Sequence, residues 1–312
     1  MLDPRVKRFL GALAAGNPPN ALEASVEQRR AALTQLMQFA GPETPVGRIE
    51  DRTIPGPSSL LNVRVYTPLE APGDGVLPGL IYFHGGGLVA GTVATHDSIA
   101  RALASAGACR VVSVEYRLAP EHRFPAALDD ALAAVEYIGT HARDFGIDNA
   151  RLGICGDSAG GTLAAATAQA LARADGPVRL ALQVLLCPIL DYSRMTDSRR
   201  ELADGYLVDQ ATLDHDLLHY VPAGTDAANP RISPLRATDL AGLPRTIIHT
   251  AEFDPLRDEG RHYFERLAHS GVAVSYTCHA GMIHLFYGLG AVIPYARTAF
   301  AQIGGEIRAA LA

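Results

Sequence analysis

Cysteine is scarce in this chain, and the four cysteines are far apart. Cys109, Cys155, Cys187 and Cys278 form no CxxC pair and lie in no Cys/His spacing that is typical of a zinc site. Most of them stand in apolar runs, which is typical of buried free thiols. We therefore expect no structural metal and a reducing compartment, the cytoplasm. The serine chemistry described below implies no cofactor.

The chain also has no tryptophan, no long hydrophobic run and no strong charge of one sign. With 48% hydrophobic and 19% charged residues and a formal net charge of -6, its 312 residues have the composition of a globular protein with a large core. This balance argues against nucleic acid as a partner. The first apolar residues are spaced like one face of a helix, so we expect neither a secretory signal nor a membrane span.

The first 45 residues predict two helices. Leu2 to Leu13 carry one apolar stripe, and the NPPN sequence at 17–20 breaks it. Ser25 and Gln28 resemble a capping box that opens a second helix, which Gly41 would close. We expect these helices to form part of an accessory cap.

From residue 46 the apolar pattern changes to that of strands. The first two strands alternate like an antiparallel pair, whereas the later ones are nearly continuous apolar runs between helices, which indicates a mostly parallel sheet covered on both faces. A polar segment at 193–234 interrupts this order and is predicted to complete the cap, which leaves 46–192 and 235–312 as the main domain. The predicted strands cover 46–56, 60–68, 80–87, 109–116, 151–155, 181–188, 245–251 and 273–279, and the clearest helices 126–142, 159–174, 256–270 and 294–311.

Ser158 is the candidate nucleophile. It is the centre of Gly156-Asp157-Ser158-Ala159-Gly160, a GxSxG sequence between a predicted strand and a predicted helix. Such a turn exposes the hydroxyl, and a helix that begins after it directs free N–H groups and a positive dipole end at the reacting centre. A glycine-rich packing turn is the alternative interpretation of the pattern.

His84 to Gly87, read HGGG, end the predicted strand at 80–87. Backbone without Cβ atoms approaches an oxyanion closely, so the N–H groups of Gly85 and Gly86, with that of Ala159, are the candidate oxyanion hole. The alternative is a tight turn in which the glycines have a structural role only.

A nucleophilic serine needs a histidine base and a carboxylate, which in this strand–turn–helix architecture follow it in the order acid, histidine. Glu252, Asp254 and Asp258 all follow a predicted strand. Asp254 lies in the loop itself and is the favoured acid, whereas Asp258 falls on the next helix. His284 lies in a late loop, which favours it over His262 and His269 within a helix and over His279 at a strand end. Asp254 is also compatible with a purely structural N-cap role.

Taken together, these motifs resemble the hormone-sensitive-lipase-like family of α/β-hydrolases, mainly bacterial carboxylesterases. The resemblance covers about residues 75 to 290 and includes HGGG, YRLAPEHRFPAALDD at 116–130, GDSAGG at 156–161, DPLRDEG at 254–260 and His284. It implies an α/β-hydrolase fold, the triad Ser158, Asp254 and His284, and a small-molecule ester as substrate, with short acyl chains preferred. It also implies that Arg117 and Glu121 form a buried pair, and that a homodimer forms through the last strand and helix.

Two positions depart from the family pattern and are candidate substrate-binding residues. Leu88 stands where a bulky aromatic often follows HGGG, and Leu285 stands where glycine often follows the histidine. Both are expected to shape the acyl or alcohol pocket.

Other functions remain open on the sequence. The same triad serves amides, carbamates or acetylated sugars, since the fold does not determine the leaving group. A non-catalytic receptor for a small ligand is a second alternative, against which His284 argues. His215 and His219, at i and i+4, are a third, a metal pair that lacks a nearby third ligand.

Overall fold

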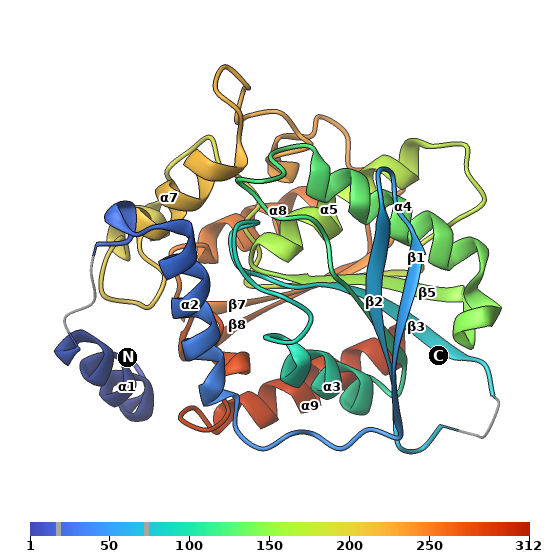
Figure 1. Ribbon diagram of the computed structural model, residues 1–312, viewed down its shortest axis with the longest axis horizontal. Helices are drawn as coiled ribbons and strands as arrows, with labels where there is room; N and C mark the ends of the chain where they lie inside the picture. Colours follow the sequence, from blue (N-terminus) through green and yellow to red (C-terminus); the bar gives the residue numbers. More distant parts are fainter. Residues whose placement is uncertain (17–19, 72–74) are drawn as a thin grey trace.

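A central sheet organises the molecule in the computed structural model, which describes residues 1–16, 20–71 and 75–312 (Figure 1). Within these residues eight strands form one sheet in the order β1-β2-β4-β3-β5-β6-β7-β8. The strands are β1 (Arg48–Pro55), β2 (Leu60–Thr67), β3 (Leu77–Phe83), β4 (Arg110–Val114), β5 (Ile147–Asp157), β6 (Leu182–Leu186), β7 (Arg245–Phe253) and β8 (Val274–Ile283).

The sheet is mostly parallel, as the apolar runs predict. β2 pairs antiparallel with both β1 and β4, and the remaining pairs from β4 to β8 are parallel. The carboxyl ends of β5, β6, β7 and β8 consequently lie next to one another in this order. Parallel sheets place binding groups at this edge, because all the loops that follow the strands meet there.

Helices cover both faces of the sheet, and each face has its own buried apolar cluster. One face carries α4 (Ala126–Thr140), α5 (Ala159–Arg173) and α8 (Arg257–His269), and the other carries α3 (Asp97–Gly107) and α9 (Tyr295–Ala310) (Figure 1). The predicted strands and the helices α4, α5, α8 and α9 are confirmed within a few residues at each end. The helix α3 was not among the elements predicted.

The N-terminal helices are α1 (Pro4–Ala15) and α2 (Val26–Met37), and α2 begins with the predicted capping box of Ser25 and Gln28. Of the predicted break at 17–20, residues 17–19 lie outside the described residues. The polar segment contributes α6 (Asp197–Glu201) and α7 (Gln210–Tyr220), and α7 packs beside the turn at Ala21–Glu23 that precedes α2. The segments of the predicted cap are therefore in contact across almost two hundred residues of sequence.

Arg117 and Glu121 do not form the buried pair that the resemblance implied. Arg117 instead binds the fully buried Asp130, with its Nη2 2.7 Å from Oδ1. Glu121 is 54% exposed and pairs with Arg30 of α2 at 2.7 Å. The prediction was wrong because the chain turns between the two positions, and each side chain meets an opposite charge from another element.

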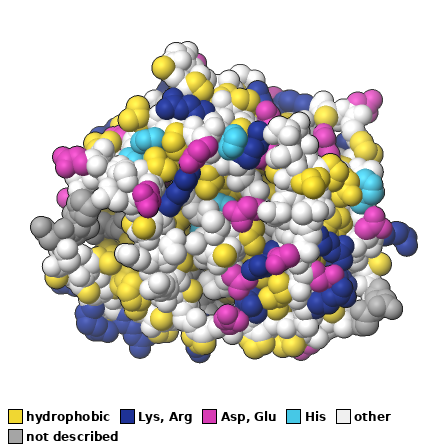
Figure 2. Space-filling view, viewed as in Figure 1, with side chains coloured by type: hydrophobic (Ala, Val, Ile, Leu, Met, Phe, Trp, Pro, Cys, Tyr) yellow, Lys and Arg dark blue, Asp and Glu magenta, His cyan; other side chains and the backbone are white. Residues whose placement is uncertain are grey.

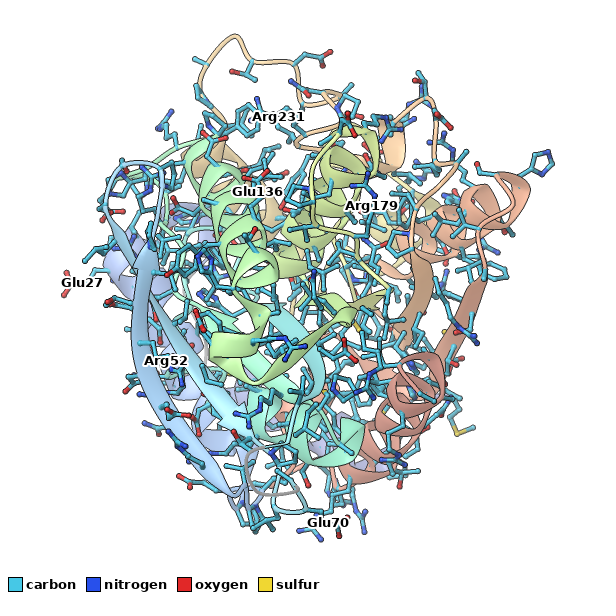
Figure 3. The ribbon with its side chains drawn as sticks, turned by 90° about the vertical axis from the view of Figure 1, so that its right-hand side faces the viewer. Glu27, Arg52, Glu70, Glu136, Arg179 and Arg231 are labelled. Atoms are coloured by element: carbon cyan, nitrogen blue, oxygen red, sulfur yellow. The ribbon has the colours of Figure 1, made fainter. Side chains whose placement is uncertain are left out.

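The surface is mixed in charge. Acidic and basic side chains alternate over the face in Figure 2. Figure 3 labels charged side chains of both signs from several segments, namely Glu27, Arg52, Glu70, Glu136, Arg179 and Arg231. No helix among the described residues is long and apolar enough to cross a membrane.

Candidate active site

Ser158 occupies a strained turn between β5 and α5. Its φ and ψ angles are 51° and -120°, which a residue with a side chain rarely adopts. The strain is held by backbone hydrogen bonds from Ser158 N to Leu186 O, at 2.9 Å, and from Gly161 N to Ser158 O, at 3.0 Å. The side chain of Ser158 makes no capping hydrogen bond to α5.

The two glycines of the GxSxG sequence are required by close backbone contacts. A Cβ atom on Gly156 would overlap the carbonyl of Gly160, and one on Gly160 would overlap the carbonyl of Phe83 at the end of β3. Backbone cannot yield in the way a flexible side chain does. The glycines therefore allow the tight turn, as predicted.

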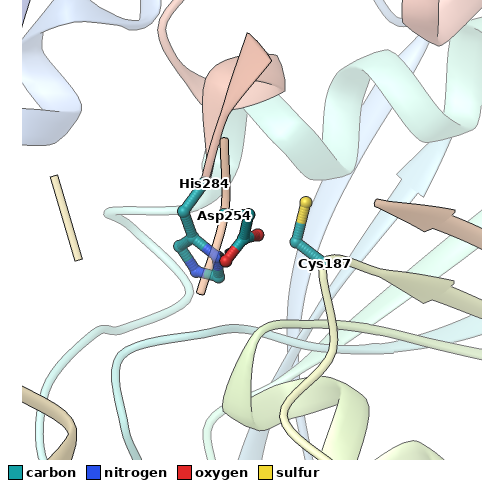
Figure 4. A group of neighbouring side chains, drawn as sticks. All are labelled: Cys187, Asp254 and His284. Atoms are coloured by element: carbon teal, nitrogen blue, oxygen red, sulfur yellow. Dashed lines mark hydrogen bonds and ion pairs between the residues drawn. The ribbon is translucent and has the colours of Figure 1, made fainter. Parts of the chain in front are cut away.

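Asp254 and His284 form a buried hydrogen-bonded pair. His284 Nδ1 lies 2.8 Å from Asp254 Oδ2, and the two side chains are 3% and 0% exposed, in the order His284 and Asp254 (Figure 4). The other carboxylate oxygen of Asp254, Oδ1, accepts a hydrogen bond from Leu256 N at 2.8 Å. The carboxylate is thus fixed from both sides, and it leaves Nε2 as the free ring nitrogen of His284.

The surroundings of His284 favour its protonated form. Burial lowers its pKa, but the negative charge of Asp254 and the hydrogen bond between them outweigh burial and raise the pKa above the ordinary value of 6.5. An imidazole of raised pKa is a stronger base. Ser158, Asp254 and His284 follow β5, β7 and β8, whose carboxyl ends lie along one edge of the sheet.

The competing acids and histidines have other partners. Glu252 accepts a hydrogen bond from Gly281 N at 2.7 Å, and Asp258 lies in α8, where it accepts from Ser198 N at 2.8 Å. His279 lies in β8 with its Nε2 2.9 Å from Nδ1 of the buried His249.

The HGGG loop follows β3, the strand next to β5, but the predicted role of Gly85 is wrong. The Gly85 N–H donates to Asp157 Oδ1 at 2.9 Å, so it is already bonded. The described residues provide no acceptor for the N–H groups of Gly86 and Gly87. Both residues have positive φ, 118° and 68°, which turns their peptide groups away from the course of a strand.

Asp157 is a supporting residue that the sequence did not reveal. It is fully buried, and its Oδ1 also accepts from the Tyr82 hydroxyl at 2.5 Å. It thereby ties the HGGG loop to the turn of Ser158. Its place inside GxSxG was the only signal, and that pattern assigns no role to the second residue.

The two predicted substrate-binding leucines are both buried. Leu88 is fully buried among core side chains and exposes no surface to a substrate, so its prediction as a pocket residue is wrong for this structure. Leu285, directly after His284, is 6% exposed and has a positive φ of 57°. It stays a candidate because its position follows the base immediately.

Two arginines of α2 bond to α7 and to the segments that follow the HGGG loop. Arg29 makes a two-pronged ion pair with Asp216 of α7, with Nη2 2.8 Å from Oδ2, and these side chains are only 15% and 4% exposed. The Asp216 carboxylate packs against Gly87 so closely that it occupies the space a Cβ atom on that residue would need. Arg30 donates to Val89 O at 2.9 Å and to Ala119 O at 3.1 Å. Sequence reasoning missed these contacts, because nothing local pairs α2 with α7.

His215 and His219 are not arranged as a metal pair. His215 lies 3.1 Å from Asp216 Oδ1 through Nδ1 and 3.1 Å from Ala24 O through Nε2. His219 Nδ1 lies 2.8 Å from His215 O. Both nitrogens of His215 thus have protein partners. Within the described residues the one group of three side chains with metal-ligand spacing is Cys187, Asp254 and His284.

The sheet topology and the order of the site residues along the chain match one known architecture. A mostly parallel sheet carries a strained serine after β5, an acid after β7 and a histidine after β8, which is the chain order of α/β-hydrolases. A family model described as alpha/beta hydrolase fold matches residues 80–288, and the chain belongs to this family. The expected resemblance to its hormone-sensitive-lipase-like branch is confirmed.

Several relatives of this chain are named as esterases. The chain is 41% identical over 281 residues to carboxylesterase NlhH of Mycobacterium tuberculosis, covering 88% of this chain and 86% of that protein. It is 36% identical over 288 residues to an arylesterase of Saccharolobus solfataricus, covering 92% of each. Among solved structures, an ester hydrolase from the metagenome of Lake Arreo superposes with a TM-score of 0.95 at 39% identity, with 99% of both chains covered.

Proposed function

We propose that this chain is a serine carboxylesterase that hydrolyses carboxylic esters of small molecules through an acyl-enzyme. The class of reaction rests on the esterase relatives, which match most of the chain. The observation that carries the mechanism is the buried Asp254–His284 pair at the sheet edge where Ser158 stands on its strained turn.

In the proposed mechanism, His284 Nε2 takes the proton of the Ser158 hydroxyl while the oxygen attacks the ester carbonyl. Asp254 holds the ring by its Nδ1–H and stabilises the imidazolium. The imidazolium then protonates the leaving alcohol, and water repeats the sequence on the acyl-enzyme. No Ser158–His284 hydrogen bond is present among the described residues, and such bonds commonly shorten only when substrate binds.

We propose a revised oxyanion hole made of the N–H groups of Gly86, Gly87 and Ala159. Gly85 is left out because its N–H is bonded to Asp157. Ala159 is the first residue of α5, so its N–H belongs to the free amides at a helix N-terminus. These donors would stabilise the negative charge that develops on the carbonyl oxygen.

We propose that residues 1–45 and 193–234 form the cap and that 46–192 and 235–312 form the catalytic domain. The Arg29–Asp216 and His215–Ala24 contacts between α2, its preceding turn and α7 support this division. The N-terminal end departs from this division, because Asp3, the residue that caps α1, donates from its N–H to Gly281 O of β8 at 3.1 Å.

A preference for short acyl chains stays a prediction from the family resemblance. One relative of this chain is named ethyl acetate hydrolase, from Pseudomonas putida, at 35% identity over 301 residues. The same site chemistry would serve amides, carbamates or acetylated sugars, so these remain the alternative substrates. A non-catalytic receptor is disfavoured by the Asp254–His284 pair, which a receptor does not need.

The test compares wild type with Ser158→Ala on p-nitrophenyl acetate, butyrate, octanoate and palmitate. Turnover should be greatest on the short esters and fall by about 10⁴- to 10⁶-fold in the variant, whose folding is checked by circular dichroism. Retained turnover in Ser158→Ala would remove the mechanism. Absence of turnover on every ester, with the wild type folded, would favour an amide, a carbamate or a receptor function.

Two further proposals concern assembly and compartment. β8 is an edge strand of the sheet, so it is free to pair with a second copy, and we propose a homodimer through β8 and α9. Sedimentation velocity should give twice the mass of the chain, and a monomer at all concentrations would contradict the proposal. The four free cysteines support the proposed cytoplasmic, reducing location.

A further inference from the structure

Cys187 has no role in the proposed reaction, yet it lies beside the Asp254–His284 pair. It follows β6, the strand between β5 and β7, so it stands in the same row of strand ends as the proposed triad. Figure 4 shows the Asp254 carboxylate between the His284 ring and the Cys187 side chain. One ligand atom of each residue lies within 4.8 Å of one ligand atom of the other two.

The backbone of Cys187 is fixed in an unusual conformation. Its φ is 43°, and its N–H donates to His249 O at 2.7 Å. A side chain rarely adopts positive φ. The thiol is buried, so neighbouring atoms restrict the rotation of the Cys187 side chain.

We propose that Cys187, Asp254 and His284 form an inhibitory binding site for a thiophilic divalent cation such as Zn²⁺ or Cd²⁺. This inference rests on the proposed function for its effect on catalysis, but not for the binding itself. The cation would bind Cys187 Sγ, an oxygen of Asp254 and Nδ1 of His284, which are three of the four ligands of a tetrahedral zinc site.

The charges and sizes suit such an ion. A thiolate, a carboxylate and a neutral imidazole together neutralise a divalent cation, which removes the main cost of burying it. Tetrahedral bonds of about 2.0–2.3 Å place ligand atoms about 3.5 Å apart. Ligand atoms that now lie up to 4.8 Å apart would therefore approach by up to about 1.3 Å, and the 2.8 Å contact between His284 Nδ1 and Asp254 Oδ2 would open by about 0.7 Å. Mg²⁺ and Ca²⁺ prefer oxygen ligands and should bind poorly.

The proton balance explains the expected inhibition. The cation displaces the thiol proton of Cys187 to solvent and takes the lone pair of His284 Nδ1, whose proton moves to Nε2. A ring that carries its proton on Nε2 cannot accept the proton of Ser158. The bound cation therefore blocks the base without touching the serine, and its onset should be slow because all three ligands are buried.

The test measures binding and turnover separately with Cd²⁺ as the probe. Cd²⁺ bound to a thiolate produces an ultraviolet charge-transfer band, so binding is measured without an ester substrate. Wild type should show this band at one Cd²⁺ per chain, with time-dependent loss of turnover that EDTA reverses. Mg²⁺ at the same concentration should leave turnover unchanged.

The matched control is Cys278→Ser, which removes the exposed thiol. It should keep both the band and the inhibition. Cys187→Ser, compared with its own metal-free rate, should lose the band and need more than 100-fold higher Cd²⁺ for inhibition, since even a supporting residue costs roughly 10- to 100-fold in affinity.

Three outcomes would overturn the proposal. They are absence of the band in wild type, a band that disappears in Cys278→Ser, and equal inhibition of Cys187→Ser and wild type. A band that depends on Cys187 in a chain without esterase activity would support the cation site and contradict only the proposed function.

Discussion

At the scale of single residues, the Asp254–His284 contact determines the expected pH dependence. The pKa of His284 is raised above 6.5, and only the neutral ring can accept a proton from Ser158. We therefore expect kcat/KM for p-nitrophenyl acetate to fall as the pH falls, with its inflection above pH 6.5. An inflection well below this value would contradict the role of Asp254 in raising the pKa.

The Asp254→Asn variant tests the same contact from the other side. Its amide would be unable to hold the Nδ1–H tautomer of His284, so kcat should fall by about 10⁴-fold while the fold stays intact. The acid inflection of the remaining activity should shift to lower pH, because the charge that raises the pKa of His284 is gone. Glu252→Gln is the control, since Glu252 contacts Gly281 rather than His284, and its turnover should match that of wild type.

The turn of Ser158 depends on a residue without a side chain. Gly156→Ala would put a Cβ against the carbonyl of Gly160, and neither backbone segment is free to move. We expect loss of the folded protein or of turnover, measured by urea unfolding and ester hydrolysis. Gly176→Ala is the matched control, because nothing lies within 4 Å of a Cβ at that position. Equal stability of the two variants would contradict the packing argument.

At the scale of elements, the ion pair of Arg29 and Asp216 joins α2 to α7. Both side chains are largely buried, so Asp216→Asn leaves a buried guanidinium without its counter-charge. We expect a loss of about 3 kcal/mol in the free energy of unfolding. Because Asp216 also lies against Gly87, the rate constant for turnover should fall as well.

An exposed ion pair provides the comparison. Asp197 and Arg200 pair within α6, where the side chains are 76% and 58% exposed. Asp197→Asn should cost less than about 1 kcal/mol, since water screens such a pair. Similar losses for Asp216→Asn and Asp197→Asn in urea unfolding would show that α7 is not held to α2 by this contact.

At the scale of the whole molecule, three buried histidines couple stability to pH. Burial lowers the pKa of His84 to about 3, that of His96 to about 4 and that of His279 to about 4, from 6.5. Between the folded and unfolded values only the unfolded chain binds the proton. The free energy of unfolding therefore falls as the pH drops from 6.5 toward 4. Each histidine contributes up to roughly 1.4 kcal/mol for each pH unit in this range.

Carboxyl groups also change the pH dependence of the free energy of unfolding, some in the opposite direction. A histidine variant is therefore needed to isolate the contribution of one histidine. Glu121, whose pKa its bond to Arg30 lowers to about 2, loses its contribution only below its ordinary value of 4.5. Burial raises the pKa of Asp157 and of Glu259, which favours the fold as the pH falls. His279→Gln should make the decline in urea stability between pH 6.5 and 4 shallower than in wild type. An unchanged slope would contradict the assignment.

Local sequence patterns are enough to predict the elements and the chemical groups of the site. Apolar periodicity located the strands from β1 to β8, and glycine spacing located the turn of Ser158, because both depend on neighbouring residues alone. Chain order after the strands then selected Asp254 and His284, since parallel strands bring their carboxyl ends to one edge.

The contacts between distant segments became visible only in the folded chain. Folding bonded the Gly85 N–H to Asp157, buried Leu88 in the core and paired Glu121 with Arg30 rather than Arg117. It also placed Cys187 beside His284. A local pattern reveals which groups a residue offers, whereas their partners depend on how helices and loops pack, and that is fixed by the chain as a whole.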